Sequence, residues 1–126
     1  MLVDDNDTDN FLSKKIMEHV NFSENILIKN TGKSALEYLH QNQNDLDKIP
    51  DIIFLDINMP IVDGFVFLYE YENFPPQLHE KVKVVVLSSS NNKRDINQFL
   101  NNRFVHQFIS KPLSEKALME LAATEA

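Results

Sequence analysis

Short apolar runs alternate with amphipathic stretches along the whole chain. Four of the apolar runs have the length of a β-strand and carry many β-branched or aromatic residues. They cover residues 25–30, 51–56, 82–88 and 104–109. A shorter run, Met1 to Val3, opens the chain. Apolar runs of about four to eight residues between polar ones are typical of strands buried on both faces. The pattern therefore predicts five buried strands.

The stretches between these runs have the spacing of helices. Apolar residues recur there three and four positions apart, as they do on one face of a helix. Such stretches cover residues 8–20, 32–42, 64–73, 93–102 and 113–123. Alternating strands and helices predict a parallel sheet covered on both faces, and right-handed crossovers then favour a doubly wound α/β fold. We expect residues 1–126 to form one domain, because a single core typically holds about 100–150 residues.

Two places depart from a regular alternation. Only Met1 to Val3 precede the acidic pair Asp4-Asp5, whereas a strand is usually about five or six residues long. Either native residues precede Met1 or the first strand is short. Further along, Pro75-Pro76 cannot continue a helix, so we expect an enlarged surface loop over residues 73–77.

The composition narrows the class of protein. The chain has 126 residues and no cysteine, which excludes a disulfide scaffold, a thiolate metal site and a thiol nucleophile. Its two glycines exclude a P-loop or a glycine-rich dinucleotide turn. Twelve Lys and Arg against 19 Asp and Glu give a net charge of −7, which argues against direct nucleic-acid binding. No apolar run approaches the roughly 20 residues of a membrane span, and we find no signal peptide, so we expect a cytoplasmic protein.

Chemically active side chains gather where the expected strands end. The first strand leads into Asp4 and Asp5, the third ends in Asp56, the fourth ends in Ser88, and Lys111 follows the fifth. In a doubly wound sheet, ligands bind outside the carboxyl ends of the strands. Each of these residues alone is most simply a cap, a turn or a strand end. Their joint occurrence after four different strands favours a functional site.

The residue types indicate what such a site would do. Three carboxylates repel one another, so the cluster either has raised pKa values or binds a cation. Oxygen ligands without cysteine or histidine favour a hard cation, for which Mg²⁺ is the natural candidate. A lysine adds a positive charge for an anion, and a hydroxyl adds a hydrogen bond. This set of groups favours phosphoryl transfer to an aspartate, with metal and lysine offsetting the charge.

One segment carries a specific resemblance. The sequence DINMPIVDG, from Asp56 to Gly64, resembles the phosphoacceptor loop of two-component response regulator receiver domains, the CheY-like family. That family's pattern is an aspartate, two residues, Met-Pro, two further residues, and Asp or Asn followed by Gly. The resemblance continues at LVDDN (residues 2–6), at Ser88 and at SKP (residues 110–112). It covers essentially the whole chain, in the family's order.

The resemblance implies a (βα)5 fold with a five-stranded parallel sheet in the order 2-1-3-4-5. It implies that Asp56 is the phosphorylated residue. It also implies that Asp5, supported by Asp4, binds Mg²⁺ together with Asp56 and the backbone carbonyl of Asn58. In the family, the positions of Asn58 and Ser90 tune the access of water and hence the lifetime of the phosphoaspartate.

The same resemblance assigns the residues of a switch. Ser88 would be the hydroxyl that turns inward to a phosphoryl oxygen. Lys111 would contact the same group, and its bond to Pro112 would be cis. Phe108, three residues before the lysine, falls on the family's aromatic switch position.

The implied partners are those of a signalling domain that catalyses only its own phosphorylation and dephosphorylation. The phosphoryl donor would be a sensor histidine kinase or a histidine phosphotransfer protein. The output would be a downstream protein target or an output domain, and the face of the fourth helix, fifth strand and fifth helix would be a candidate for homodimerisation. We see no output domain after the fifth helix, so the expectation is either a stand-alone receiver or a receiver cut from a longer regulator.

Two alternative functions stay open. A haloacid-dehalogenase-like phosphatase also uses a strand-end aspartate and Mg²⁺, but it needs a second aspartate two residues later, where this chain has Asn58. No cap domain fits in a chain of this length. The other alternative is a receiver-like interaction module that no longer takes phosphate, which the presence of all the expected side chains disfavours.

Overall fold

The computed structural model describes residues 1–57, 63–88 and 93–125, apart from the side chains of residues 93–95, 124 and 125. The strands are β1 (Leu2–Val3), β2 (Ile28–Lys29), β3 (Ile52–Leu55), β4 (Lys83–Ser88) and β5 (Val105–Ser110). The helices are α1 (Asp7–His19), α2 (Gly32–Asn42), the 3-10 helix η1 (Leu46–Lys48), α3 (Gly64–Tyr71), α4 (Pro76–Lys81), α5 (Lys93–Leu100) and α6 (Glu115–Glu125).

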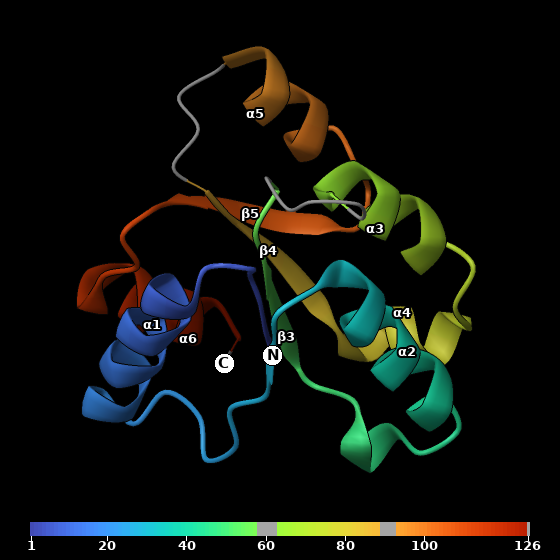
Figure 1. Cartoon of the computed structure of the whole chain (residues 1–126), viewed down its shortest axis with the longest axis horizontal. Coiled ribbons are helices and arrows are strands. Elements are labelled where there is room, and N and C mark those ends of the chain that lie inside the picture. Colours follow the sequence, from blue (N-terminus) through green and yellow to red (C-terminus); the bar gives the residue numbers. More distant parts are fainter. Residues whose placement is uncertain (58–62, 89–92, 126) are drawn as a thin grey trace.

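The strands form one parallel sheet in the order β2-β1-β3-β4-β5, which confirms the predicted fold (Figure 1). β1 lies second from the edge and pairs on both sides, so that Leu2 is opposite Ile28 in β2 and Phe54 in β3. The chain therefore leaves β1 between two neighbours, at the point where the strand order reverses. In sheets of this kind that point is where ligands bind.

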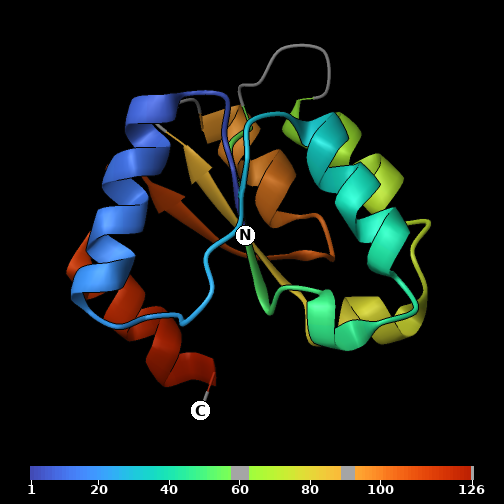
Figure 2. The ribbon, with the colours of Figure 1, turned by 60° about the horizontal axis from the view of Figure 1, so that its bottom comes forward.

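Two apolar cores lie on opposite faces of the sheet. α1 and α6 cover one face, and α2, α3, α4 and α5 cover the other (Figure 2). In β4, Val84 and Val86 point into the core beneath α2 to α5, whereas Val85 and Leu87 point into the core beneath α1 and α6. Because both faces are covered, the middle strands are apolar throughout, and polar side chains occur only at their ends.

Side-chain caps fix where the helices begin. Asn6, Thr31 and Asp63 precede α1, α2 and α3, and in each case the side-chain oxygen accepts a hydrogen bond from the backbone N–H three residues later. Such a cap satisfies one of the N–H groups that the first helical turn leaves without a partner. Among the residues that the structure describes, no helix has both the length and the apolar character needed to span a bilayer.

The region after Pro75 differs from the expected surface loop. Pro76 opens α4, a six-residue helix whose Leu78 is fully buried in the core. His79 packs its ring 4.5 Å from that of Phe104, and its Nε2 atom lies 2.8 Å from the carbonyl oxygen of Tyr71. The prediction was wrong because a proline that cannot continue a helix is well suited to start one, where its missing N–H has no intrahelical partner. Within the described residues the structure thus has six α-helices, one more than the predicted five.

Gly64 is placed where the chain turns from the sheet into α3. Its backbone N–H donates to the carbonyl oxygen of Ile57 at 3.2 Å. A Cβ atom added to Gly64 would lie 2.9 Å from both Cα and Cγ2 of Ile57. The first of these two atoms belongs to the backbone, which cannot simply rotate away, so the close approach requires glycine.

We therefore expect Gly64→Ala to lower the free energy of unfolding by roughly 1–3 kcal/mol, the usual cost of overpacking. Urea denaturation followed by circular dichroism would measure it. Replacing Ile57 by alanine removes the clash with Cγ2 but leaves the clash with the backbone. Part of the loss should therefore persist when Gly64→Ala is made in that background. Equal stability of Gly64→Ala and the wild type would contradict the close approach.

Candidate functional site

The backbone of the sheet positions three of the predicted site residues. Hydrogen bonds of the sheet continue one residue beyond the strands. The N–H of Asp4 donates to the last carbonyl oxygen of β2 at 3.1 Å, and the N–H of Asp56 donates to the last carbonyl oxygen of β1 at 2.9 Å. The N–H of Lys111 donates to the last carbonyl of β4, also at 2.9 Å. The backbone of each of these residues is thus held in place at the carboxyl edge of the sheet.

Three predicted carboxylates meet at this edge. Asp4, Asp5 and Asp56 each offer an oxygen atom, and these atoms all lie within 4.8 Å of one another. Asp4 and Asp56 are 5% and 6% exposed, while Asp5 is exposed to solvent. Two more hydrogen bonds hold Asp4 in place. Its Oδ1 atom accepts from the N–H of Asn6 at 2.9 Å, and its backbone carbonyl accepts from the side-chain amide of Asn10.

The side chain of Lys111 reaches into the same cluster. Its Nζ atom donates to Oδ2 of Asp4 at 2.7 Å and to Oδ2 of Asp9 at 2.8 Å, and it lies 3.7 Å from Oδ2 of Asp56. The lysine side chain is only 14% exposed. One ammonium group therefore faces carboxylates that come from three different parts of the chain.

Burial would by itself lower the pKa of Lys111. The hydrogen bonds to Asp4 and Asp9 and the charge of Asp56 outweigh that effect and raise its pKa to about 12. The group is therefore a firmly charged ammonium at neutral pH. It is able to offset negative charge and to bind an anion, but not to act as a base.

The two predicted switch residues lie on one face of the sheet. Ser88 ends β4 and is fully buried, and the strand's alternation places it on the face of Val86. Phe108 in β5 is half-buried, pairs with Val86 in register, and packs on that same face. The bond between Lys111 and Pro112 is cis, as the resemblance implied.

Two further predicted residues, Asn58 and Ser90, lie outside the described part of the chain.

Asp9 is a site residue that the sequence reasoning missed. The spacing within residues 8–20 indicates only the apolar face of the helix, and an acid in the first turn of a helix is common because it suits the helix dipole. The available signal was its position, since α1 begins directly after the acidic pair. A side chain in the first turn of α1 could therefore return to the edge of the sheet.

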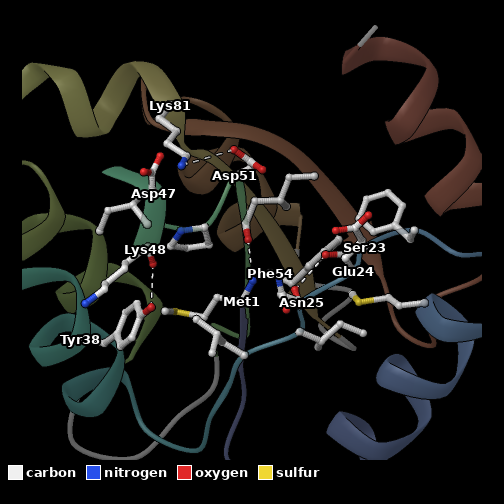
Figure 3. A pocket seen from close by; sticks show the side chains of 17 residues that line it. Met1, Ser23, Glu24, Asn25, Tyr38, Asp47, Lys48, Asp51, Phe54 and Lys81 are labelled. Atoms are coloured by element: carbon white, nitrogen blue, oxygen red, sulfur yellow. Dashed lines mark hydrogen bonds and ion pairs between the residues drawn. The ribbon is translucent and has the colours of Figure 1, made fainter. Parts of the chain in front are cut away.

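A pocket of about 590 Å³ lies at the opposite end of the sheet (Figure 3). It is lined around the starts of β1 and β3 by Met1, Tyr38, Asp51 and Lys81, among others. None of the predicted site residues lines it. The predicted site residues therefore lie at the carboxyl edge of the sheet and not at this pocket.

Comparisons with known proteins agree with this geometry. The family model described as response regulator receiver domain matches residues 1–123. A protein named probable methanogenesis regulatory protein FilR2, from Methanothrix harundinacea, is 30% identical over 90% of this chain and 72% of its own length. A two-component response regulator structure from Cytophaga hutchinsonii matches with a TM-score of 0.89 and 31% identity, over 98% of this chain and 92% of that one. The Mn²⁺-bound structure of response regulator Rcp1, a protein of Synechocystis, matches with a TM-score of 0.71 and 27% identity, over 98% and 87% of the two chains.

The pairing of Lys111 with buried carboxylates at the carboxyl edge leads to a prediction on the stability of the fold. We expect Lys111→Met to lower the free energy of unfolding at pH 7 by roughly 3 kcal/mol, because it leaves buried carboxylates without their cation. The pKa of Lys111 is higher in the folded protein than its ordinary value of 10.5, so the ammonium stabilises the fold fully below that pH. This stabilisation is lost as the pH rises through about 12.

The gap in stability between the wild type and Lys111→Met should therefore narrow between about pH 10 and pH 12, as measured by urea denaturation at a series of pH values. Lys48→Met is the matched control, since the Lys48 side chain is 63% exposed and its removal should cost little at any pH. A gap that stays constant over this range would show that the ammonium is not held by these carboxylates.

Proposed function

The chain belongs to the response regulator receiver domain family, and on that premise we propose that it is a signalling domain that accepts a phosphoryl group on Asp56. The observation that carries the proposal is the meeting of Asp56 with Asp4 and Asp5, with the ammonium of Lys111 at 3.7 Å. A nucleophilic carboxylate, further acidic ligands and a cation are the groups that phosphoryl transfer requires. Their positions at the switch point of the sheet support it.

The proposed reaction takes the phosphoryl group from a phosphohistidine of a sensor kinase or of a phosphotransfer protein. A carboxylate oxygen of Asp56 attacks the phosphorus atom, so that an O–P bond forms while the P–N bond to the histidine breaks. The electron pair of that bond stays on the imidazole nitrogen, which can then take a proton. Lys111 offsets the charge on the phosphoryl oxygens, which it is suited to do because its raised pKa keeps it charged.

The carboxylate cluster is suited to a divalent cation. Its ligand atoms are all oxygens, they approach one another within 4.8 Å, and the nearby ammonium offsets only part of their charge. Asp4, Asp5 and Asp56 would hold Mg²⁺, and the existence of an Mn²⁺-bound form of Rcp1 supports a divalent ion in a protein of this fold. When bound, the ion would supply positive charge for the phosphoryl oxygens.

A switch would follow from the added charge. A phosphorylated Asp56 carries more negative charge than the carboxylate, and it places acceptor oxygens at the end of β3. We propose that Ser88 donates a hydrogen bond to one of these oxygens and that Phe108 follows the movement of the β4 end. Their common face of the sheet, beneath α5, supports this coupling. The change would bias the surface that partners read.

Residues 1–126 are proposed to act as one receiver domain, and the family match over residues 1–123 supports this extent. The output surface is proposed to be the face of α5, β5 and α6. This is the predicted dimer face, because the additional helix α4 makes the predicted fourth and fifth helices α5 and α6 of the structure. Leu100 and Met119 are 49% and 64% exposed on its two helices, which supports docking of a second copy there.

We expect the wild type to gain the mass of one phosphoryl group on incubation with acetyl phosphate and Mg²⁺, and Asp56→Asn to gain none. Intact-mass spectrometry measures both. Asp51→Asn is the matched control, because Asp51 precedes the same strand and its side chain is 80% exposed at the opposite end of the sheet. A folded wild type that gains no mass would favour the phosphate-independent interaction module. Continuous release of phosphate from simple esters would favour the phosphatase.

We expect Asp5→Asn to weaken Mg²⁺ binding at least about 10-fold, since it removes a charged ligand of the ion. Isothermal titration calorimetry with Mg²⁺ alone, in the absence of any phosphoryl donor, gives the affinity. Asp47→Asn changes the net charge equally at an exposed position outside the cluster and should leave the affinity within about twofold. Equal affinities of the wild type and Asp5→Asn would place the ion elsewhere.

A further inference from the structure

Asp9 contacts the site through the lysine. Its Oδ2 atom lies 2.8 Å from Nζ of Lys111, and Asp4 accepts from the same ammonium at 2.7 Å. The separation to the phosphoacceptor Asp56 is longer, at 3.7 Å. Two of the three N–H donors of the ammonium are therefore directed to carboxylates other than the one that would be phosphorylated.

The first turn of α1 holds Asp9 in this position. The N–H of Asp9 donates to the cap side chain of Asn6 at 3.0 Å, and the N–H of Asn6 donates in turn to Oδ1 of Asp4 at 2.9 Å. The start of α1 is thus linked by hydrogen bonds to the edge of the sheet. Asp9 is not among the carboxylates that approach one another within 4.8 Å, and its side chain is 36% exposed. Its contact with the site is the ammonium of Lys111.

We propose that Asp9 is a positioning residue that holds Lys111 away from Asp56 and thereby opposes phosphorylation. The inference rests on the proposed function. For the ammonium to contact a phosphoryl oxygen on Asp56, it must give up one of its two short hydrogen bonds. Asp9 is the partner it gives up, because the side chain of Asp9 is 36% exposed and can turn to water, whereas Asp4 is 5% exposed and has no such alternative in solvent.

A second effect of Asp9 also disfavours phosphorylation of Asp56. Its Oδ2 atom lies 2.8 Å from the ammonium nitrogen that is itself 3.7 Å from Oδ2 of Asp56, so its negative charge is close to the proposed site of the phosphoryl group. Competition for the ammonium and repulsion of the incoming anion both disfavour the phosphorylated form. Asp9 would therefore raise the concentration of phosphoryl donor that is needed to phosphorylate Asp56.

The test compares Asp9→Asn with Asp7→Asn. Both aspartates lie in the first turn of α1, so both changes remove one charge from the same helix end. Asp7, however, contacts the side chain of Asn30 and not the lysine. The phosphorylated fraction at steady state is measured by intact mass over a range of acetyl phosphate concentrations, at fixed Mg²⁺ and low salt.

We expect Asp9→Asn to reach half-maximal phosphorylation at an acetyl phosphate concentration about 3- to 10-fold lower than the wild type, as for loss of one charge-assisted hydrogen bond at a partly exposed site. Asp7→Asn should stay within about twofold of the wild type. Asp9→Glu keeps the carboxylate, so its half-maximal acetyl phosphate concentration should lie close to that of the wild type. The gain of Asp9→Asn should also shrink in high salt, a response that a merely structural defect in α1 would not give.

An unchanged or higher half-maximal concentration for Asp9→Asn would overturn the proposal, and so would an equal gain for Asp7→Asn. A wild type that takes no phosphoryl group under these conditions would overturn the proposed function and, with it, this inference. Phosphorylation of all variants with equal midpoints would leave the proposed function intact and refute the role of Asp9 alone.

Discussion

The carboxyl edge of the sheet depends on the ammonium group of Lys111. It joins residues more than 100 positions away in the chain, since it donates both to Asp4 after β1 and to Asp9 in α1. Carboxylates that are buried side by side repel strongly, because a protein interior screens charge less than water does. A cation held among them makes the arrangement stable, and the same cation is what an incoming anion would meet. The stability of this edge and the proposed chemistry thus depend on the same ammonium group.

The core explains why these groups lie where they do. β3 and β4 are covered by helices on both faces, so their side chains are apolar and the polar residues occupy the strand ends. The ladder hydrogen bonds continue one residue beyond the strands and fix the backbone of Asp4, Asp56 and Lys111. The sheet therefore fixes the points at which these three side chains begin. A group placed this way can be kept close to its repelling neighbours, which a flexible loop could not achieve.

Two features of the structure differ from what the chain's pattern indicates, for different reasons. Pro75-Pro76 suggests a break and hence a loop, whereas Pro76 starts a helix, α4, that buries Leu78. Asp9 escapes notice because nothing local separates an acid that favours the helix dipole from one that reaches another element. The first error is a misinterpretation of local chemistry. The second arises because apolar spacing says nothing about where a polar side chain in the first turn points, and the only signal for Asp9 was its position just after the acidic pair, 102 positions before its partner Lys111.

The sequence by itself determined the alternation of buried strands and amphipathic helices, the parallel sheet that follows from it, and the gathering of Asp4, Asp5, Asp56, Ser88 and Lys111 at one edge. These are consequences of periodicity and of the rule that parallel strands deliver their carboxyl ends to the same side. Only the tertiary structure decided which carboxylates share the ammonium and which of them stays exposed. That choice depends on the distance and angle at which α1 leaves the sheet, and those are set by packing against α6 and by the cap at Asn6 rather than by any local preference.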